Sequence, residues 1–294
     1  MSDGTIAERH VDLDIGRIRV REAGDGPPVV LVHGALVNGH LWDDVIPLLA
    51  DRHRVIAPDL PLGCHAEPVR PGAGLGLPAQ ADVVGDLLAA LGLEDVTLVG
   101  NDTGGAICQL VVTRRPEGIG GLVLTSCDAF DNCPPRFFRF LVWASYLPGN
   151  AWLLGQTMRS PRFARLPVAF GRLTHRGLDR ERLDRMFGPL RRSRGVRRDL
   201  VRMLRSLDAA DTQAAAAALG GVTMPVLIAW SADDGIFPPE HASRLAALLP
   251  HATLSPIADS LAFSPIDQPA TLARAIAEFA SGANAGGEAA PGAT

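Results

Sequence analysis

The chain has 294 residues, enough for one large domain or for a core domain with an inserted lid. Apolar residues make up 47% and charged residues 20% of the sequence, which is ordinary for a globular enzyme. All 28 basic residues are arginine, the formal net charge is −4, and no basic motif large enough for a groove occurs, so we expect no nucleic-acid partner.

The N-terminal segment and the cysteines indicate the compartment. Residues 1–21 contain no basic segment followed by an apolar run, and no stretch reaches the ~18 consecutive apolar residues of a membrane span. We therefore expect a cytoplasmic protein without a membrane partner. The cysteines show neither C-x-x-C nor zinc-ligand spacing, so we expect reduced thiols and no metal or cofactor; they are Cys64, Cys108, Cys127 and Cys133.

The first half of the chain alternates strands with helices. Two alternating runs, 11–13 and 18–20, predict an antiparallel hairpin, and the β-branched run 29–32 predicts a strand buried on both faces. The elements expected next are a helix at 42–49, a strand at 54–57, a helix at 79–91, a strand at 96–99, a helix at 106–113 and a strand at 121–125. This alternation indicates an α/β fold with a mostly parallel sheet covered on both faces.

The pattern changes after the sixth strand. Residues 131–211 contain no convincing strand, only helical segments with 17 Arg against 7 Asp plus Glu, which puts a charge of +10 there and −14 on the rest. The alternation resumes with strands at 226–230 and 253–257 and helices at 241–249 and 270–279. We predict a core domain at 1–130 and 212–280, a helical lid or cap at 131–211 between the sixth and seventh strands, and a disordered tail at 281–294.

A glycine-rich turn follows the strand at 96–99. Residues 100–104 read Gly-Asn-Asp-Thr-Gly and fit the G-x-nucleophile-x-G pattern of a strained strand-to-helix turn, with Asp102 in the nucleophile position. Free N–H groups at the start of a helix favour an ionised carboxylate there. The alternative is an aspartate that only caps the helix in an ordinary turn.

A second motif favours the nucleophile interpretation. His33-Gly34-Ala35 follows the buried strand, and in this arrangement the backbone N–H groups of Ala35 and Thr103 converge on the nucleophile as an oxyanion hole. We expect His33 to hold this loop rather than to transfer protons.

These motifs together resemble the α/β-hydrolase superfamily, from the first hairpin to the last helix. An aspartate in the nucleophile position is similar to haloalkane dehalogenases and epoxide hydrolases. The resemblance implies that the carboxylate attacks carbon and forms an ester, which water then hydrolyses with the help of a histidine–acid pair.

The resemblance also implies an acid partner. Residues 230–238 (WSADDGIFP) are similar to the family's G-x-x-D-x-x-x-P segment after the seventh strand, with serine in place of glycine. Asp234 matches the acid, and Asp233 is its nearby competitor. Some dehalogenases take the acid after the sixth strand, where Asp128 and Asp131 lie. For each of these aspartates the alternative is a surface residue in a turn with no catalytic role. For Asp128 we prefer that alternative.

The catalytic histidine of the family is missing from its usual place. The family segment G-H-F-x-x-x-x-x-P corresponds to 261–269, where Phe263 and Pro269 align and Ala262 occupies the histidine position. His241 and His251 are not natural replacements.

Other family positions differ as well. Dehalogenases carry Trp after the nucleophile and often Asn after His-Gly, but this chain has Thr103 and Ala35 there. Epoxide hydrolases use lid tyrosines as acids, and Tyr146 is the single tyrosine here. Further candidate substrate contacts are His33, Asn101, Trp42, Ala262 and Phe263, although Trp42 also suits a core position.

The residues therefore predict an enzyme that uses Asp102, under a helical lid, on a small and largely apolar molecule. It is a hydrolase if Asp102 attacks carbon, or a lyase, isomerase or cyclase if Asp102 is a general acid or base. The alternative is a non-catalytic ligand-binding protein. The sequence leaves open a homo-oligomer, and it leaves open whether the lid arginines attract an anionic substrate or form ordinary surface ion pairs.

Overall fold

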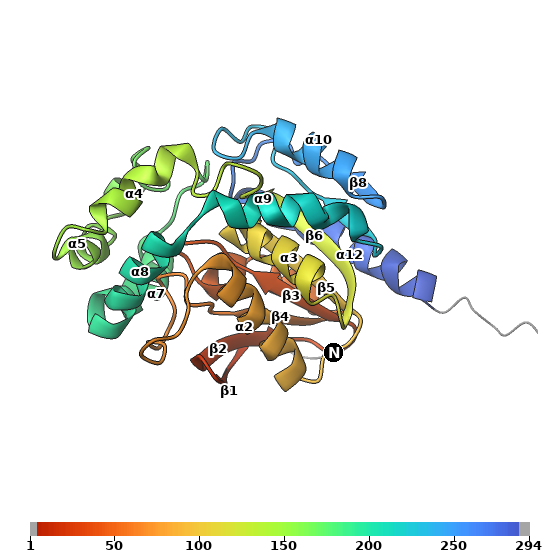
Figure 1. Cartoon of the computed structure of the whole chain (residues 1–294), viewed down its shortest axis with the longest axis horizontal. Coiled ribbons are helices and arrows are strands. Elements are labelled where there is room, and N and C mark those ends of the chain that lie inside the picture. The colour runs from red at the N-terminus through yellow and green to blue at the C-terminus, as the bar shows by residue number, and fades with distance from the viewer. Residues whose placement is uncertain (1–4, 288–294) are drawn as a thin grey trace, which may run out of the picture.

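The computed structural model describes residues 5–287 and contains one eight-stranded sheet in the order β1-β2-β4-β3-β5-β6-β7-β8 (Figure 1). β1 pairs with β2 and β2 with β4 in antiparallel fashion, and the other pairs are parallel. The strands are β1 (Ala7–Leu13), β2 (Gly16–Ala23), β3 (Pro28–Val32), β4 (Arg54–Pro58), β5 (Val96–Asp102), β6 (Ile119–Cys127), β7 (Val226–Ile228) and β8 (Ala252–Leu254). The mostly parallel α/β sheet predicted from the sequence is confirmed.

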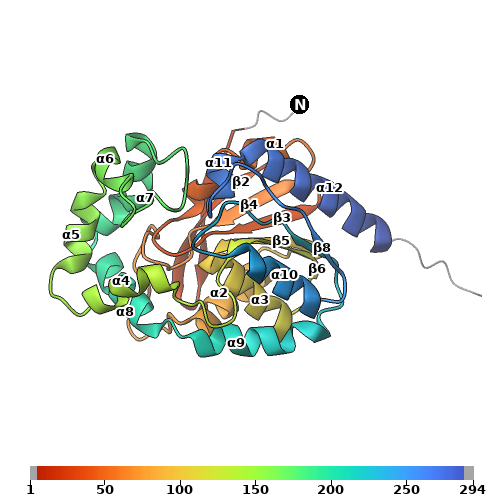
Figure 2. The ribbon, with the colours of Figure 1, turned by 90° about the horizontal axis from the view of Figure 1, so that it is seen from above.

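Helices cover both faces of the sheet. Figure 2 shows α2 (Leu77–Ala90), α3 (Thr103–Arg114) and α9 (Ala209–Ala218) on one side, and α1 (Ile46–Leu49), α11 (Ser264–Asp267) and α12 (Pro269–Gly287) on the other. Between them every residue of β5 is buried, as a two-sided apolar strand requires. The remaining helices outside the inserted segment are η1 (Gly39–Trp42), η3 (Leu219–Gly221) and α10 (Pro239–Leu248).

Two predicted boundaries differ from the structure. The helix expected at 42–49 is two short helices, η1 and α1, because Pro47 lies in the first turn of α1 and cannot continue a preceding helix. The last helix runs to Gly287, so residues 281–287 of the expected disordered tail are helical and continue the helix that begins at Pro269, although three of these seven residues are glycine. Residues 288–294 of that tail lie outside the described part of the chain.

The helices of residues 136–206, between β6 and β7, gather at one end of the sheet, opposite α12 (Figures 1 and 2). We call residues 131–211 the cap. Its boundary falls inside a helix, because α9 begins at Ala209 and packs against α3 of the body. The cap helices are η2 (Arg136–Phe138), α4 (Arg139–Ala144), α5 (Asn150–Thr157), α6 (Pro161–Ala164), α7 (Arg180–Arg192) and α8 (Arg194–Ser206).

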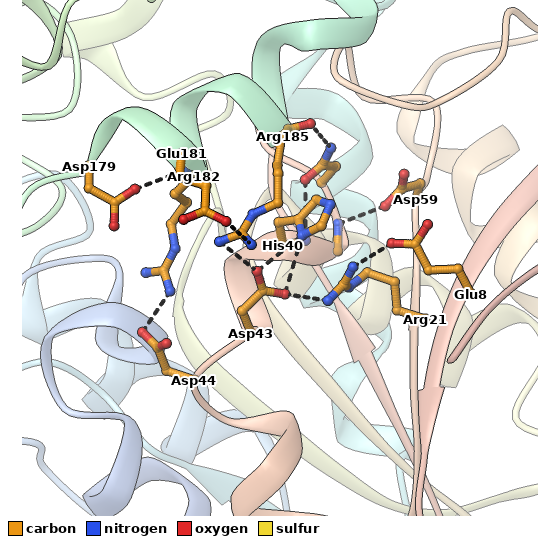
Figure 3. Close-up of polar contacts among 12 residues, drawn as sticks. Glu8, Arg21, His40, Asp43, Asp44, Asp59, Asp179, Glu181, Arg182 and Arg185 are labelled. Carbon is orange, nitrogen blue, oxygen red and sulfur yellow. Dashed lines mark hydrogen bonds and ion pairs between the residues drawn. The ribbon is translucent and has the colours of Figure 1, made fainter. Parts of the chain in front are cut away.

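Charged side chains attach α7 to the body (Figure 3). Asp43 accepts a hydrogen bond from Arg21 at 2.7 Å and another from His40 at 3.0 Å, and Arg185 of α7 lies 3.5 Å from it. Arg21 also pairs with Glu8 at 2.6 Å. We call these five residues the Asp43 cluster. The neighbouring pair Arg182–Asp44, at 2.8 Å, makes a second link between α7 and the body.

The order of the strands positions the candidate site. β3 and β5 are parallel neighbours with Val32 opposite Gly100, so the loop that follows β3 lies beside the turn that follows β5. β6 is the next neighbour, with Cys127 opposite Asp102. The carboxyl ends of β3, β5 and β6 therefore meet at one edge of the sheet, where parallel α/β sheets bind their ligands.

Candidate active site

Asp102 lies on a strained turn between β5 and α3. Its backbone has φ 57° and ψ −133°, a conformation that residues with side chains rarely adopt. The glycines after it permit the tight turn: a Cβ on Gly104 would come within 2.6 Å of the His33 carbonyl oxygen, and one on Gly105 within 2.5 Å of the Cys127 sulfur. The turn therefore has the geometry of a nucleophile elbow.

Two backbone N–H groups hold one oxygen of the Asp102 carboxyl group. Oδ1 accepts hydrogen bonds from Thr103 N at 2.6 Å and from Ala35 N at 3.1 Å. The loop after β3 can come this close because residue 34 is glycine, where a Cβ would lie 2.5 Å from Asp102 Cγ. Oδ1 is therefore fixed.

The cap closes an apolar cavity of about 80 Å³ over Asp102. Since a cavity of about 10–15 Å³ already accommodates one water molecule, this space suits a small organic molecule. Among the described residues that line it, Asp102 and Thr103 alone have polar side chains. The others are Ala35 and Leu36 from the body, and Pro134, Pro135, Phe138, Leu141, Val142, Leu154, Met158, Val168, Ala169, Phe170, Leu173, Phe187, Leu204 and Leu207 from the cap.

A second buried carboxyl group lies beside Asp102. Asp128, directly after β6, is 1% exposed and accepts a hydrogen bond from Thr103 Oγ1 at 3.0 Å. It is therefore not the surface aspartate that the sequence favoured, because the cap covers the edge of the sheet where β6 ends. Burial, and then the charge of Asp102, raises the pKa of Asp128 well above its usual range.

The carboxyl groups of Asp102 and Asp128 differ in the number of hydrogen bonds that they accept. Burial raises the pKa of Asp102, but the hydrogen bonds from Thr103 and Ala35 oppose this rise. Asp128 accepts one hydrogen bond through Oδ2, and its Oδ1 has no partner among the described residues. We infer that Asp102 ionises first while Asp128 keeps its proton.

Asp234 lies on the loop after β7, beside this pair but outside the cavity lining. Its Oδ1 accepts hydrogen bonds from Ile236 N at 2.8 Å and Phe237 N at 3.0 Å, and within residues 5–287 its buried Oδ2 has no hydrogen-bond partner. Burial raises the pKa of Asp234 to about 6, against the effect of these hydrogen bonds. The competing candidates are exposed: Asp233 lies 4.0 Å from His175, and Asp131 lies 3.7 Å from Arg136.

The position of the family histidine is part of a buried framework. Ala262 is fully buried, and its carbonyl oxygen accepts a hydrogen bond from Asn101 Nδ2 at 2.8 Å. Asn101 also donates to Thr125 Oγ1 at 2.8 Å, and Phe263 packs against Phe170 of the cap with ring centroids 5.9 Å apart. Asn101, Ala262 and Phe263 thus lie next to the cavity rather than in its lining.

No histidine lines the cavity within residues 5–287. His33 is fully buried; Leu60 N donates to its Nε2 at 2.9 Å, and its Nδ1 lies 2.8 Å from Gly34 O, so the ring supports the loop. Burial lowers the pKa of His33 to about 4, which keeps the ring neutral. His241 packs edge-on against Phe130, and the exposed His251 precedes β8 at its far end.

Trp42 and Tyr146 also lie outside the cavity lining. Trp42 is fully buried in the core, and Tyr146 is 64% exposed on the cap with the Arg205 guanidinium 4.1 Å from its ring centroid. Sequence reasoning missed the aliphatic and aromatic cap residues that close the cavity. Their signal is weak, because short arginine-rich helices show which face is apolar but not what it covers. Within the described part of the chain, no three metal-binding side chains converge.

The fold and the site define a class of protein. A mostly parallel eight-stranded sheet, an acidic residue on a nucleophile elbow and a helical insertion after β6 are the features of the α/β-hydrolase architecture. Residues 27–269 match the family model described as "alpha/beta hydrolase fold". The chain belongs to this family.

Individual relatives agree with the family assignment. "Uncharacterized protein Rv2715" of Mycobacterium tuberculosis is 30% identical over 281 residues, covering 88% of this chain and 76% of the relative. "Haloalkane dehalogenase 2" of the same organism is 37% identical over 117 residues, 40% of each chain. The crystal structure of haloalkane dehalogenase DbeA from Bradyrhizobium elkani USDA94 superposes with a TM-score of 0.78 at 24% identity, covering 96% of this chain and all of that one. The chain is thus related to haloalkane dehalogenases and to epoxide hydrolases.

Proposed function

We propose that this protein is an enzyme that brings a small, neutral, largely apolar organic molecule against the Asp102 carboxyl group. The observation that carries the proposal is the composition of the cavity: Asp102 is the one titratable side chain among its described lining residues. A buried carboxyl group facing apolar walls is costly for folding alone, and such perturbed groups concentrate at reaction sites.

The chemistry that fits best is proton transfer without hydrolysis, as in an isomerase or lyase. Burial raises the pKa of Asp102 above its ordinary value, which makes the carboxylate a better proton acceptor from a substrate. Oδ1 is held by two N–H groups, so Oδ2 would accept a proton from a carbon atom of the substrate and return it to another. This route needs no histidine.

Relationship to the dehalogenases favours a second candidate, in which Asp102 attacks carbon and forms an ester. The ester would then persist, because no described lining residue can activate water. Departure of a halide would also be poorly assisted, since Thr103 and Ala35 occupy the positions where dehalogenases carry Trp and often Asn.

One experiment separates the candidates. The protein would be incubated in deuterium oxide with small ketones, and separately with epoxides, haloalkanes and esters, and followed by NMR and by intact-protein mass. Deuterium incorporation into a ketone supports proton transfer, and a stable mass increase supports ester formation. In either case Asp102→Asn, which keeps the shape but removes the base and the nucleophile, should lower the rate by at least ~10³.

A variant that keeps a tenth of the wild-type rate would remove Asp102 from the mechanism. Rapid multiple-turnover halide release by the unmodified protein would contradict both routes. Binding of the probes with neither exchange nor adduct would instead identify a ligand-binding protein without catalysis.

A further inference from the structure

An apolar tip projects from the outer surface of the cap, at the turn between α4 and α5. Among the described residues, eight of the eleven large hydrophobic side chains that are exposed belong to the cap. The tip is formed by Trp143, 79% exposed, Tyr146 and Leu147, each 64%, Leu153, 53%, and Trp152, 52%. Two exposed tryptophans within ten residues of chain are unusual for a solvent-facing surface and mark an interaction site.

Arginines of α8 line a groove beside this tip. Tyr146, Leu147 and Trp152 form one wall, and the other wall carries Arg194, Arg197, Arg198, Arg202 and Arg205. The groove is therefore both apolar and strongly basic.

The charge of these arginines is only partly neutralised. Asp199 pairs with Arg198 at 2.7 Å and with Arg202 at 3.8 Å, and it is buried under them. Arg197 and Arg205 donate to backbone carbonyl groups, which carry no net charge. Segment 140–160, which contains the tip, has no acidic residue. The surface thus carries an excess of positive charge.

This combination argues against a second copy of the chain as the partner. A two-fold dimer through the same patch would place the arginines of one α8 opposite those of the other. Such like charges repel, whereas an anionic partner would be attracted.

We propose that the outer face of the cap binds the surface of an anionic lipid bilayer. Tryptophan and tyrosine favour the boundary between headgroups and acyl chains, and each arginine near an anionic membrane contributes about 1 kcal/mol, a factor of about five in affinity. The tip enters the headgroup region, and the α8 arginines contact lipid phosphates. Within residues 5–287 no helix is long and apolar enough to cross a membrane. The sequence predicted no membrane partner from the lack of such a span, and it could not show that the tip is exposed.

The position of the cavity favours a bilayer over an acidic protein. Leu141 and Val142 of α4 and Leu154 of α5 line the cavity on the inner side of the same two helices that carry the tip. An apolar molecule dissolved in the bilayer would therefore meet these helices on its way to Asp102. This preference for a bilayer rests on the proposed function, but membrane binding itself needs no reaction at Asp102, so the two can fail separately.

The test is co-sedimentation with vesicles of phosphatidylcholine alone and with about 30% phosphatidylglycerol. We expect binding to the anionic vesicles to exceed binding to the neutral ones at least tenfold and to fall as salt is raised. Trp143→Ser with Trp152→Ser should lower binding at least tenfold. Arg194→Glu should lower it at least fivefold; Arg194 has no hydrogen bond or ion pair to lose among the described residues. The matched controls Leu48→Ser and Arg52→Glu, exposed on the body near α1, should bind as the wild type does.

Tryptophan fluorescence shows whether the tip inserts. Trp42 and Trp230 are buried in the core, so a blue shift and quenching by brominated lipids would report Trp143 and Trp152. Equal binding to neutral and anionic vesicles, binding without quenching, or unchanged binding by the tip variants would overturn the proposal. Self-association that the tip variants abolish, or binding to soluble polyglutamate as tight as to anionic vesicles, would overturn it in favour of a second copy or an acidic protein.

Discussion

Three buried carboxyl groups, Asp102, Asp128 and Asp234, lie at the carboxyl ends of β5, β6 and β7. In the described chain none of them forms an ion pair with an arginine or histidine side chain. The family pattern would place a histidine near these groups, but this chain has Ala262 there. The local structure instead supports them with backbone N–H groups and with the Thr103 hydroxyl. Burial without a neighbouring positive charge raises the pKa of all three carboxyl groups.

The raised pKa of Asp234 predicts a pH-dependent stability. The folded protein keeps the Asp234 proton up to about pH 6, whereas the unfolded chain loses it near the ordinary value of 3.8. Wild-type stability should therefore fall as the pH rises through this window. Asp234→Asn removes this titration, so its free energy of unfolding relative to the wild type should increase by up to about 3 kcal/mol between about pH 4 and about pH 6.

Urea unfolding across this range measures the Asp234 effect. Asp233→Asn, at the exposed neighbouring position, is the matched control and should change stability by less than about 0.5 kcal/mol. If the difference in unfolding free energy between Asp234→Asn and the wild type does not change with pH, the pKa of Asp234 is not raised in the folded protein.

Ala262→His tests whether the missing histidine limits hydrolysis. The site is fully buried, so the larger ring should cost about 1–3 kcal/mol of stability. If its ring reaches an ester on Asp102, with the free Oδ2 of Asp234 as its partner, the ester should decay at least ~10²-fold faster, as general-base catalysis permits. Intact-protein mass after removal of the alkylating agent follows this decay. Ala262→Gln, of similar size but without a base, is the control; equal decay in both variants would contradict the idea.

At the scale of elements, the strand-to-helix turn depends on the close approach of α3 to β6. A helical glycine replaced by alanine normally gains up to ~1 kcal/mol, but a Cβ on Gly105 would overlap the Cys127 side chain. Gly105→Ala should therefore destabilise the fold by about 1–3 kcal/mol and also displace Asp102. Thermal unfolding shows whether Gly105→Ala lowers or raises the stability. Gly235→Ala is the control, because a Cβ on Gly235 meets nothing within 4 Å. A Gly105→Ala protein more stable than the wild type would refute the role assigned to this contact.

Most elements of the body could be predicted because their signals are local. The β-branched run at 29–32 and the glycines around Asp102 identify a buried strand and a tight turn without any knowledge of the rest of the chain. Asp128 could not be placed this way, because its burial depends on the cap, which covers the end of β6. Pro47 is the local feature that divides the helix expected at 42–49, because a proline begins a helix but cannot continue one.

At the scale of the whole molecule, the relation between cap and body was the least predictable part. Arginine-rich helices were expected at 131–211, but their pattern does not say which arginines face the body. The structure shows that Arg182 and Arg185 of α7 pair with Asp44 and Asp43. Arginines of α8 line the outer groove, and two of them, Arg198 and Arg202, also donate to the body carbonyl groups of Val69 and Ala73. The positive charge of the cap is thus divided between contacts with the body and an outer surface.

The Asp43 cluster predicts how firmly the cap is held. Burial alone would raise the pKa of Asp43, but the hydrogen bond from His40 and the charges of His40, Arg21 and Arg185 outweigh it and leave the pKa lowered. A lowered pKa means that Asp43 stabilises the fold above the ordinary value of 3.8, and that this contribution is lost as the pH falls towards the folded-state pKa. Asp43→Asn keeps the size but removes the charge, so it should cost about 2 kcal/mol at neutral pH and progressively less below about pH 4.

The loss of this charge should appear first where α7 meets η1. Hydrogen exchange and limited proteolysis should show faster opening of α7 in Asp43→Asn, while β3 and β5 stay protected. In that variant the Arg182–Asp44 pair is the one remaining ion pair, among the described residues, between α7 and the segment after η1. Asp12→Asn is the matched control, since Asp12 is 85% exposed and its pair with Arg17 spans 3.8 Å; it should have little effect. Uniformly faster exchange throughout the body would show that Asp43 stabilises the whole fold rather than the attachment of the cap. Unchanged exchange in α7 would show that apolar packing over the cavity is sufficient to hold the cap closed.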